Sequence, residues 1–480
     1  MAKISSKKVR LKILQAKKLK LILKAQSIIS MADLLIKDGY LVFPDITVRS
    51  SIYSEDGIIK SIGSSVPNTA DVVIDAFEKY VLPGAIDEHV HCRDPGLTYK
   101  EDFETCTKSA AAGGVTAIFD MPNNIPPVDD AVKLREKAEI IASKAHVDFA
   151  LYGVIHGSNT DKFEEMLEAG AIGFKVYLAH STGNIQPPGD GAIVETLTKS
   201  AKTNSVVVFH AENDSIIEFY TKKLIQNGRK DPKAHMEARP ALAEEEAIRR
   251  VSLFAERTGA RVLIAHVSSA SGLSALKEAR DRGSKIYGET CPHYLLLDES
   301  DYEKYGNMIK INPPVRTASD KEALWKGIEN GTITNIGSDH APHLLEEKSK
   351  GVWESASGII GVQTIYPLML NEALKGRISI NAIVGLLSEN PAKLFGIYGK
   401  KGNISVNADA DFVLFDPLAT FKINEDWIYS KGKNSPFIGW ELKGKIIKTI
   451  LRGKEIYDGE KVVEKTGKQL KSSNIEFKSI

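Results

Sequence analysis

The chain has 480 residues, which is more than one average domain and fits comfortably within two. Its hydrophobic content of 42% permits a sizeable core and excludes a chain that is disordered throughout. The 63 basic and 62 acidic residues nearly cancel, but residues 1–30 hold nine basic residues and no acidic one. The other 54 basic and 62 acidic residues leave a mildly acidic body, which argues against nucleic-acid binding as its main activity.

The cysteine count and the hydropathy pattern indicate the compartment. The three cysteines, Cys92, Cys106 and Cys291, are too few for a disulfide framework, so a reducing cytoplasm is the expected location. No apolar run reaches the ~18 residues that a membrane span needs. We therefore expect a cytoplasmic globular protein that acts on small molecules, with neither a membrane nor a nucleic acid as partner.

Residues 1–30 form a basic N-terminal extension. Lysine interrupts every short apolar run in it, so it lacks the apolar region of about 7–15 residues that a signal peptide needs. A basic amphipathic helix on a membrane or on RNA is one interpretation. A solvated extension, or a start codon assigned too far upstream, is favoured, because Met31 leads directly into the first expected strand.

Short strands and turns dominate both flanks of the remaining chain. Residues 32–82 contain Asp-Gly pairs at 38–39 and 56–57, which predict hairpin turns between apolar runs. Residues 402–458 have the same style. The expected organisation is a composite β-sandwich of residues 31–83 and 397–460, with residues 461–480 as a C-terminal tail.

Strands and helices alternate between these flanks, which is typical of parallel βαβ units. The helix after the first of these strands is expected to start with a capping box of Thr98 and Glu101 and to end at Gly113-Gly114. Eight strands fit a (β/α)8 barrel over residues 84–396. A doubly wound sheet is the competing fold, but no G-x-G-x-x-G follows the first strand. The strand-like runs end near His91, Pro122, Ile155, Leu178, Glu212, Ser268, Pro292 and His340.

Five polar residues stand where barrel strands meet their catalytic loops. His89 and His91 project from the same face of one strand, since residues i and i+2 point the same way, and make half of a metal site. His210, His266 and Asp339 each end another apolar run. Any one of them is as compatible with a core or capping residue as with a ligand, but chance explains poorly that all of them occupy strand ends.

Lys175 lies inside the apolar run from Ala171 to Leu178, where a bare ammonium needs a partner or a lowered pKa. An amphipathic lysine that reaches solvent is the ordinary interpretation. A neutral lysine amine can instead combine with carbon dioxide, and the resulting carbamate has two oxygens that can bridge two cations. With the other five residues, such a group predicts a two-metal site that activates water and polarises a carbonyl.

A family resemblance rests on these motifs taken together. It covers residues 32–458 and is to the dihydroorotase family of the amidohydrolase superfamily, whose relatives include hydantoinase and allantoinase. It implies a barrel with a small β-sandwich. The motifs are His89-Val-His-Cys-Arg-Asp-Pro-Gly, Asp120-Met-Pro-Asn, Gly173-Phe-Lys-Val-Tyr, His210-Ala-Glu, His266-Val-Ser-Ser, Asp339-His-Ala-Pro-His and Asn390-Pro-Ala-Lys-Leu-Phe-Gly.

The resemblance implies two Zn²⁺ ions per subunit, although Mn or Co would also suit such ligands. His89 and His91 would bind the more buried ion, and His210 and His266 the outer one. Lys175, carboxylated on its amine, would bridge the two ions. Asp339 would bind the buried ion and act as the catalytic proton shuttle.

The resemblance also implies a substrate pocket. Arg93 presents a fork that suits a carboxylate, with Asn123 and His343 completing the pocket and Asn312 holding the ring amide. The alternatives are a surface salt bridge for Arg93 and turn chemistry for the asparagines. Residues 356–364 lack the two prolines and the glutamate frequent in the family, and Asn124 stands where threonine is common, which leaves the dynamics of the loop open.

The sequence-based prediction is a dihydroorotase that interconverts N-carbamoyl-L-aspartate and L-dihydroorotate in pyrimidine (UMP) biosynthesis. Two alternatives stay open. One is a hydantoinase- or allantoinase-like enzyme for another cyclic amide. The other is a non-catalytic homologue that serves as a scaffold, although such homologues typically lose metal ligands. A homo-oligomer is left open, and association with an aspartate transcarbamoylase has no support in the sequence.

Overall fold

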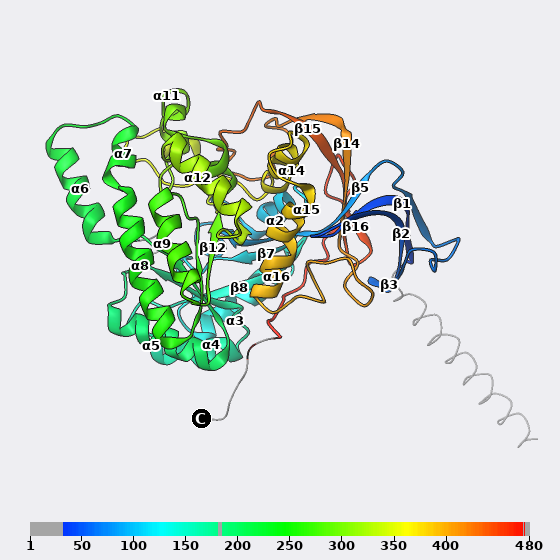
Figure 1. Cartoon of the computed structure of the whole chain (residues 1–480), viewed down its shortest axis with the longest axis horizontal. Helices are drawn as coiled ribbons and strands as arrows, with labels where there is room; N and C mark the ends of the chain where they lie inside the picture. Colours follow the sequence, from blue (N-terminus) through cyan, green and yellow to red (C-terminus); the bar gives the residue numbers. More distant parts are fainter. Residues whose placement is uncertain (1–31, 181–184, 474, 476–480) are drawn as a thin grey trace, which may run out of the picture.

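A computed structural model describes residues 32–180, 185–473 and 475, and the basic extension of residues 1–30 lies outside them. Within these ranges the chain forms a barrel of parallel strands surrounded by helices, with a second sheet beside it (Figure 1). No helix of the described part is long and apolar enough to cross a membrane.

The barrel contains eight strands in sequence order, each parallel to its neighbours. A parallel bridge between Val90 and His340 joins the last strand to the first, and the His91 amide donates to the His340 carbonyl at 2.8 Å. The predicted (β/α)8 barrel is confirmed. Its strands are β6 (Ala85–Val90), β7 (Val115–Asp120), β8 (Asp148–Val154), β9 (Gly173–Tyr177), β10 (Val206–His210), β11 (Arg261–Ile264), β12 (Ile286–Thr290) and β13 (Asn335–Ile336).

Helices cover the outside of the barrel, and strands β6 to β10 are buried along their whole length, as strands covered on both faces must be. Side chains that can contact a ligand are therefore expected at the strand ends and in the loops. The helices are α2 (Phe103–Ala112), α3 (Ala131–Ala142), α4 (Phe163–Glu168), α5 (Asp190–Thr203), α6 (Asp214–Gln226), α7 (Lys233–Ala238), α8 (Ala241–Thr258), α9 (Ala270–Asp281), α10 (Pro292–Leu296), α11 (Tyr302–Tyr305), α12 (Ala318–Glu329), α13 (Leu345–Lys348), α14 (Ile365–Leu374), α15 (Ile380–Val384) and α16 (Asn390–Leu394).

Helix α2 corrects one expectation. Its end at Gly113 is confirmed, but its capping box consists of Asp102 and Thr105, so the predicted pair of Thr98 and Glu101 is wrong. Glu101 is fully buried and accepts a hydrogen bond from the Ser430 hydroxyl, a residue of the C-terminal flank. The Glu101 carboxylate, which the local pattern predicted to cap the helix, therefore makes a tertiary contact instead.

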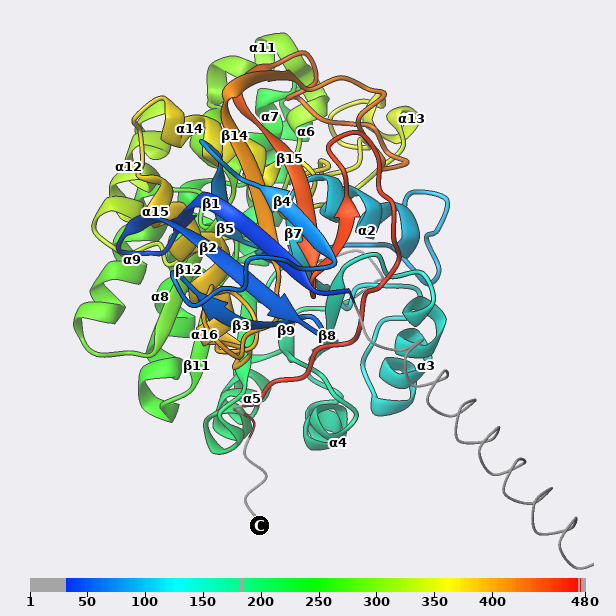
Figure 2. The same cartoon turned by 90° about the vertical axis from the view of Figure 1, so that its right-hand side faces the viewer.

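The second sheet combines both flanks of the chain in the order β16-β15-β14-β5-β1-β2-β3, with β4 paired to β1, which confirms the composite domain (Figure 2). From the N-terminal flank come β1 (Leu34–Val42), β2 (Thr47–Glu55), β3 (Ile58–Ile62), β4 (Val72–Asp75) and β5 (Tyr80–Pro83). The C-terminal flank supplies β14 (Phe412–Lys422), β15 (Glu441–Leu451) and β16 (Lys454–Tyr457).

The two Asp-Gly pairs have different structures. The pair at 56–57 forms the predicted hairpin turn between β2 and β3. The pair at 38–39 is no hairpin: it lies within β1, where the register shifts between Ile36 and Gly39 and Asp38 has a φ of 57°. A Cβ on Gly39 would lie 2.6 Å from a methyl carbon of Val81, so packing against β5 selects a bulge in a continuous strand.

Residues after β16 run back along the barrel instead of leaving the molecule (Figure 2). The Phe149 amide donates to the Lys468 carbonyl at 3.0 Å, and the Leu470 amide donates to the Phe149 carbonyl at 2.7 Å. Leu470 is buried in an apolar cluster with Phe119 and Tyr152. Residues 461–473 thus add a segment to the barrel, and the exact domain boundaries stay a prediction.

A buried ion cluster joins the second sheet to the barrel. Lys401 lies 2.5 Å from Asp148 of β8, 2.8 Å from Asp409 and 2.7 Å from Asp411. Arg452 adds a second cation that contacts Asp148. The two parts of the chain are therefore connected by largely buried charges that depend on one another.

Candidate metal and substrate site

A cavity of about 300 Å³ opens at the carboxyl ends of the barrel strands, where barrel enzymes have their active sites. It brings together all ten residues that the sequence analysis selected. Those residues are His89, His91, Arg93, Asn123, Lys175, His210, His266, Asn312, Asp339 and His343.

Three of them form a compact group that can hold a metal ion: His89, His91 and Asp339. The Nε2 atoms of both histidines lie 3.3 Å from Oδ1 of Asp339. Burial alone would raise the pKa of Asp339, but the neighbouring imidazoles hold it well below its usual range. The backbone of Asp339 is strained, with a φ of 45°, which is common where a residue is held for function.

The second pair of histidines comes from the end of β10 and from the second residue after β11. Nδ1 of His210 lies 3.0 Å from Nε2 of His266, and the ring centroids are 4.7 Å apart. The His266 ring also lies 5.2 Å from the ring of His89, between their centroids. The four imidazoles therefore lie in one continuous row, and their role as metal ligands stays a prediction.

Partners on the far side of the rings determine which nitrogen faces the cavity. Oε1 of Glu289 accepts from Nδ1 of His89 at 2.7 Å, so Nε2 of His89 keeps its lone pair. The Asn123 side-chain oxygen accepts from Nδ1 of His91 at 2.7 Å with the same result. Glu212 accepts from Nε2 of His210 at 2.9 Å, which leaves Nδ1 of that ring as the donor atom for a metal. The sequence analysis missed Glu289 and Glu212 as partners.

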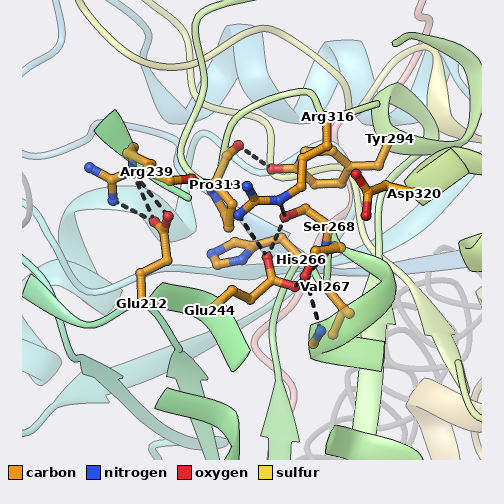
Figure 3. A network of polar contacts seen from close by, with 12 residues as sticks. Glu212, Arg239, Glu244, His266, Val267, Ser268, Tyr294, Pro313, Arg316 and Asp320 are labelled. Carbon is orange, nitrogen blue, oxygen red and sulfur yellow. Dashed lines mark hydrogen bonds and ion pairs between the residues drawn. The ribbon is translucent and has the colours of Figure 1, made fainter. Parts of the chain in front are cut away.

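Glu212, the hydrogen-bond partner of His210, belongs to a network of buried charges (Figure 3). Nε of Arg239 donates to both carboxylate oxygens of Glu212 at 3.1 Å. Burial would raise the pKa of Glu212, but Arg239 and His210 hold it well below its usual range. Arg316 links this pair to the next layer, because it donates to the Arg239 carbonyl at 2.9 Å and to the Ser268 hydroxyl at 2.8 Å.

Lys175 lines the same cavity as the two histidine pairs. Its side chain is fully buried, and its amine has no hydrogen-bond partner among the described residues. Burial lowers the pKa of Lys175 to about 8, so about a tenth of the amine is neutral at pH 7. A buried amine that loses its proton easily and lines the same cavity as the four histidines and Asp339 fits the chemistry of a carbamate that would bridge two cations.

A cluster of two cations, Arg93 and Lys100, contacts the ring of His343, which lines the cavity. Nη2 of Arg93 lies 3.3 Å from Nε2 of His343, and Nζ of Lys100 lies 3.1 Å from Nδ1 of the same ring. The Ser357 carbonyl accepts from Nε2 at 3.0 Å, so Nδ1 accepts from Lys100 and the ring is neutral. Burial and the two cations lower the pKa of His343 to about 2. The sequence analysis missed Lys100.

Both asparagines that were predicted to bind substrate line the cavity, but their side chains differ in hydrogen bonding. Asn123 uses its oxygen for His91, so only its amide hydrogens are available to a ligand. The side-chain oxygen of Asn312 is buried and has no partner within the described ranges. Asn312 is thus equipped to accept a hydrogen bond from a ring N–H, whereas Asn123 also supports a metal-ligand histidine.

The loop that lacks the family's prolines is held by a buried lysine. Nζ of Lys348 donates to the carbonyls of Lys310 at 2.9 Å, Ala356 at 3.0 Å and Gly358 at 3.0 Å. Burial lowers the pKa of Lys348 to about 7, while three carbonyls match the three donors of an ammonium. The clamp fixes residues 356–358, which line the cavity, to the segment that carries Asn312.

Comparison with known proteins identifies the group to which this site belongs. Residues 80–456 match the Amidohydrolase family. The chain belongs to this family. It is 37% identical to an L-hydantoinase of Paenarthrobacter aurescens over 442 residues, covering 90% of this chain and 96% of that protein. An allantoinase of Rubrobacter xylanophilus is 35% identical over 438 residues, with 90% and 96% covered.

Solved structures agree with this assignment. The L-hydantoinase (dihydropyrimidinase) of Arthrobacter aurescens has a TM-score of 0.89 at 35% identity and covers 92% of this chain and 99% of its own. A dihydropyrimidinase of Brevibacillus agri has a TM-score of 0.85 at 30% identity, covering 93% and 100%. These relatives are named hydantoinase, dihydropyrimidinase and allantoinase. The family prediction is therefore confirmed at the level of the amidohydrolases, and the narrower dihydroorotase assignment is not.

Proposed function

We propose that this protein is a metal-dependent amidohydrolase of the hydantoinase and allantoinase type, which opens a cyclic amide ring in the cytoplasm. One observation carries the proposal: two histidine pairs meet at the carboxyl edge of the barrel around a buried lysine amine that has no hydrogen-bond partner among the described residues. The names of the relatives favour a cyclic amide or ureide substrate. The retained ligand set speaks against a purely structural homologue.

The donor set suits two divalent cations, with Zn²⁺ as the first candidate for nitrogen and oxygen ligands. His89, His91 and Asp339 would hold one cation and His210 and His266 the other, with carboxylated Lys175 between them. Two such cations would supply a water of lowered pKa and would polarise the carbonyl of the substrate.

The protein's own groups perform the proton transfers and the positioning. Asp339 is an ionised carboxylate beside the reaction centre, so it can take the proton of the attacking water and pass it to the departing ring nitrogen. The free Asn312 oxygen can accept a ring N–H, and the amide hydrogens of Asn123 can donate to a ring carbonyl. These contacts orient the ring over the metal ligands.

Dihydroorotase is the second candidate, because Arg93 places a buried cation beside His343 in the lining of the cavity. A ring that carries a carboxylate, such as L-dihydroorotate, would be held there by the Arg93 fork with Asn123 and His343. The reaction would then be the reversible cyclisation of N-carbamoyl-L-aspartate in pyrimidine biosynthesis. An unsubstituted hydantoin or allantoin has no carboxylate that uses this charge.

A substrate panel on metal-loaded protein tests both candidates. Hydantoin, a 5-substituted hydantoin, allantoin, dihydrouracil and L-dihydroorotate are compared by kcat/KM, with Asp339→Asn as the inactive control. The highest value on a neutral ring supports the main proposal. The highest value on dihydroorotate, with KM raised at least about tenfold by Arg93→Lys, selects the second candidate. No turnover of any ring by protein with two bound metals contradicts both.

A further inference from the structure

Two cysteines touch beneath the loop that carries the cation cluster. The sulfurs of Cys92 and Cys106 are 2.7 Å apart, and both side chains have 0% exposure. Even carbon atoms that are not bonded pack at about 3.5–4.0 Å, whereas a disulfide bond is about 2.05 Å long. The two sulfur atoms are therefore closer than separate atoms pack, and only a small movement separates them from a covalent bond.

The backbone on each side is anchored, so the approach of the sulfurs does not depend on a flexible segment. The Cys92 amide donates to Oδ1 of Asp120 at 2.9 Å, and Lys137 is paired with the other oxygen of that carboxylate at 2.7 Å. Cys106 lies in the first half of α2, whose start is capped by Asp102. Both cysteines are held in place by contacts that do not involve the sulfurs.

The segment between the two cysteines contains the cations of the substrate side. Arg93 follows Cys92 directly with a φ of 62°, and Lys100 lies near the middle of the segment. Both side chains contact the ring of His343. A bond between the sulfurs would close this loop at its base without touching the cavity itself.

We propose that Cys92 and Cys106 are a site of covalent modification, an intrachain disulfide that closes the loop of residues 93–105. Each thiol loses its hydrogen, and a small disulfide such as oxidised glutathione accepts the two electrons and two protons and becomes two thiols. Cys291, at the start of α10, stays a thiol. Because neither side chain is exposed in the folded protein, the bond forms while the chain folds.

Thiol counting on the full-length protein tests the proposal. Reduced protein is equilibrated in glutathione redox buffer, both as the folded protein and by refolding from denaturant, then alkylated and analysed by peptide mass. We expect one alkylated cysteine, Cys291, and a linked pair of peptides containing Cys92 and Cys106. Cys291→Ser should leave no alkylated cysteine, and Cys106→Ser should leave two. Three alkylated cysteines after both treatments, or a bond that involves Cys291, would overturn the proposal.

Thermal unfolding tests whether the bond stabilises the loop. The oxidised protein should unfold a few degrees higher than the reduced one, since a closed loop restricts the unfolded chain. The shift should disappear on adding reductant and should be absent in Cys106→Ser. The same upward shift in Cys106→Ser would assign the effect to another part of the protein and overturn this role of the pair.

Discussion

Two fully buried lysines in this barrel have opposite environments. Lys401, where the second sheet meets β8, lies within 2.8 Å of three carboxylates, and although burial opposes it, these raise its pKa above the usual value. Lys175, at the carboxyl edge, has no hydrogen-bond partner in the described ranges, and burial lowers its pKa to about 8. One lysine is a permanent ion that connects two domains. The other is available for chemistry.

The difference shows how to separate architecture from function in a protein interior. A buried charge that serves the fold is surrounded by its counter-ions, because leaving it unpaired costs several kcal/mol. A buried amine without a counter-ion persists only where something else uses it. Partners, and not burial, therefore distinguish the two lysines, and each of the following predictions tests one side of this contrast.

Replacing the unpaired lysine should have the largest effect. We expect Lys175→Ala to lower kcat by at least about 10⁴-fold, because a member of a catalytic unit is lost, while the fold is retained since no partner is orphaned. Metal analysis of the purified variant should give about one ion in place of two. A short carboxylic acid added to the assay should restore part of the activity. Normal activity with two bound ions would show that Lys175 is not the bridge.

Replacing the paired lysine should give the reverse pattern. Lys401→Met leaves Asp148, Asp409 and Asp411 buried with one cation fewer, so we expect a loss of about 3–5 kcal/mol in the free energy of unfolding. Denaturant unfolding measures the loss. The protein that remains folded should keep its kcat and its metal content. A stable variant with impaired metal binding would invert the contrast and contradict the structural role.

The carboxylates behind the histidines should act mainly on one metal each. Glu212→Gln should weaken the outer ion about 10–100-fold, because the amide holds the His210 ring less firmly than the carboxylate does. Glu289→Gln is the matched variant and should weaken mainly the ion at His89, with a smaller effect at the outer ion, because the same oxygen also accepts from the His266 amide at 3.0 Å. Chelator competition on the two variants, which reports both dissociation constants, measures the effect. Equal losses at both ions in both variants would argue for a general disturbance of the barrel.

The smallest effect concerns pH. Carbamate formation needs the neutral amine, and with a pKa of about 8 the neutral fraction of Lys175 rises about tenfold between pH 7 and pH 9. The rate at which metal-free protein regains activity, at constant carbon dioxide pressure and saturating metal, should rise by the same factor and level off above pH 9. Protein kept free of carbon dioxide should not recover. A rate independent of both pH and carbon dioxide would contradict a carbamate.

Much of the site could be predicted from local patterns in the sequence. A barrel strand carries its functional side chain at its carboxyl end, so His89, His91, His210, His266 and Asp339 could be selected from where apolar runs stop, and the cavity brings them together. Alternation of apolar strands with amphipathic helices gave the barrel in the same way. These features depend on neighbours within one element, which a linear pattern contains.

Local patterns misled where a distant residue took over. The Asp-Gly pair at 38–39 has the composition of a hairpin turn, yet β5 packs against Gly39 and keeps the strand continuous. Glu101 fits a capping box but is buried against Ser430, more than three hundred residues away. In both cases a tertiary contact outweighed a local preference of about 1 kcal/mol.

The amino-acid order alone determines the (β/α)8 barrel, the composite second sheet and which side chains reach its carboxyl edge, because periodicity and strand ends are local properties. The tertiary structure alone decides which nitrogen each histidine presents, since Glu289 meets His89 across 200 residues and Asn123 meets His91 across 32. It also decides that Lys175 is left without a hydrogen-bond partner among the described residues while Lys401 is neutralised. Pairing of charges depends on distances in space, and those exist only once the chain has closed the barrel.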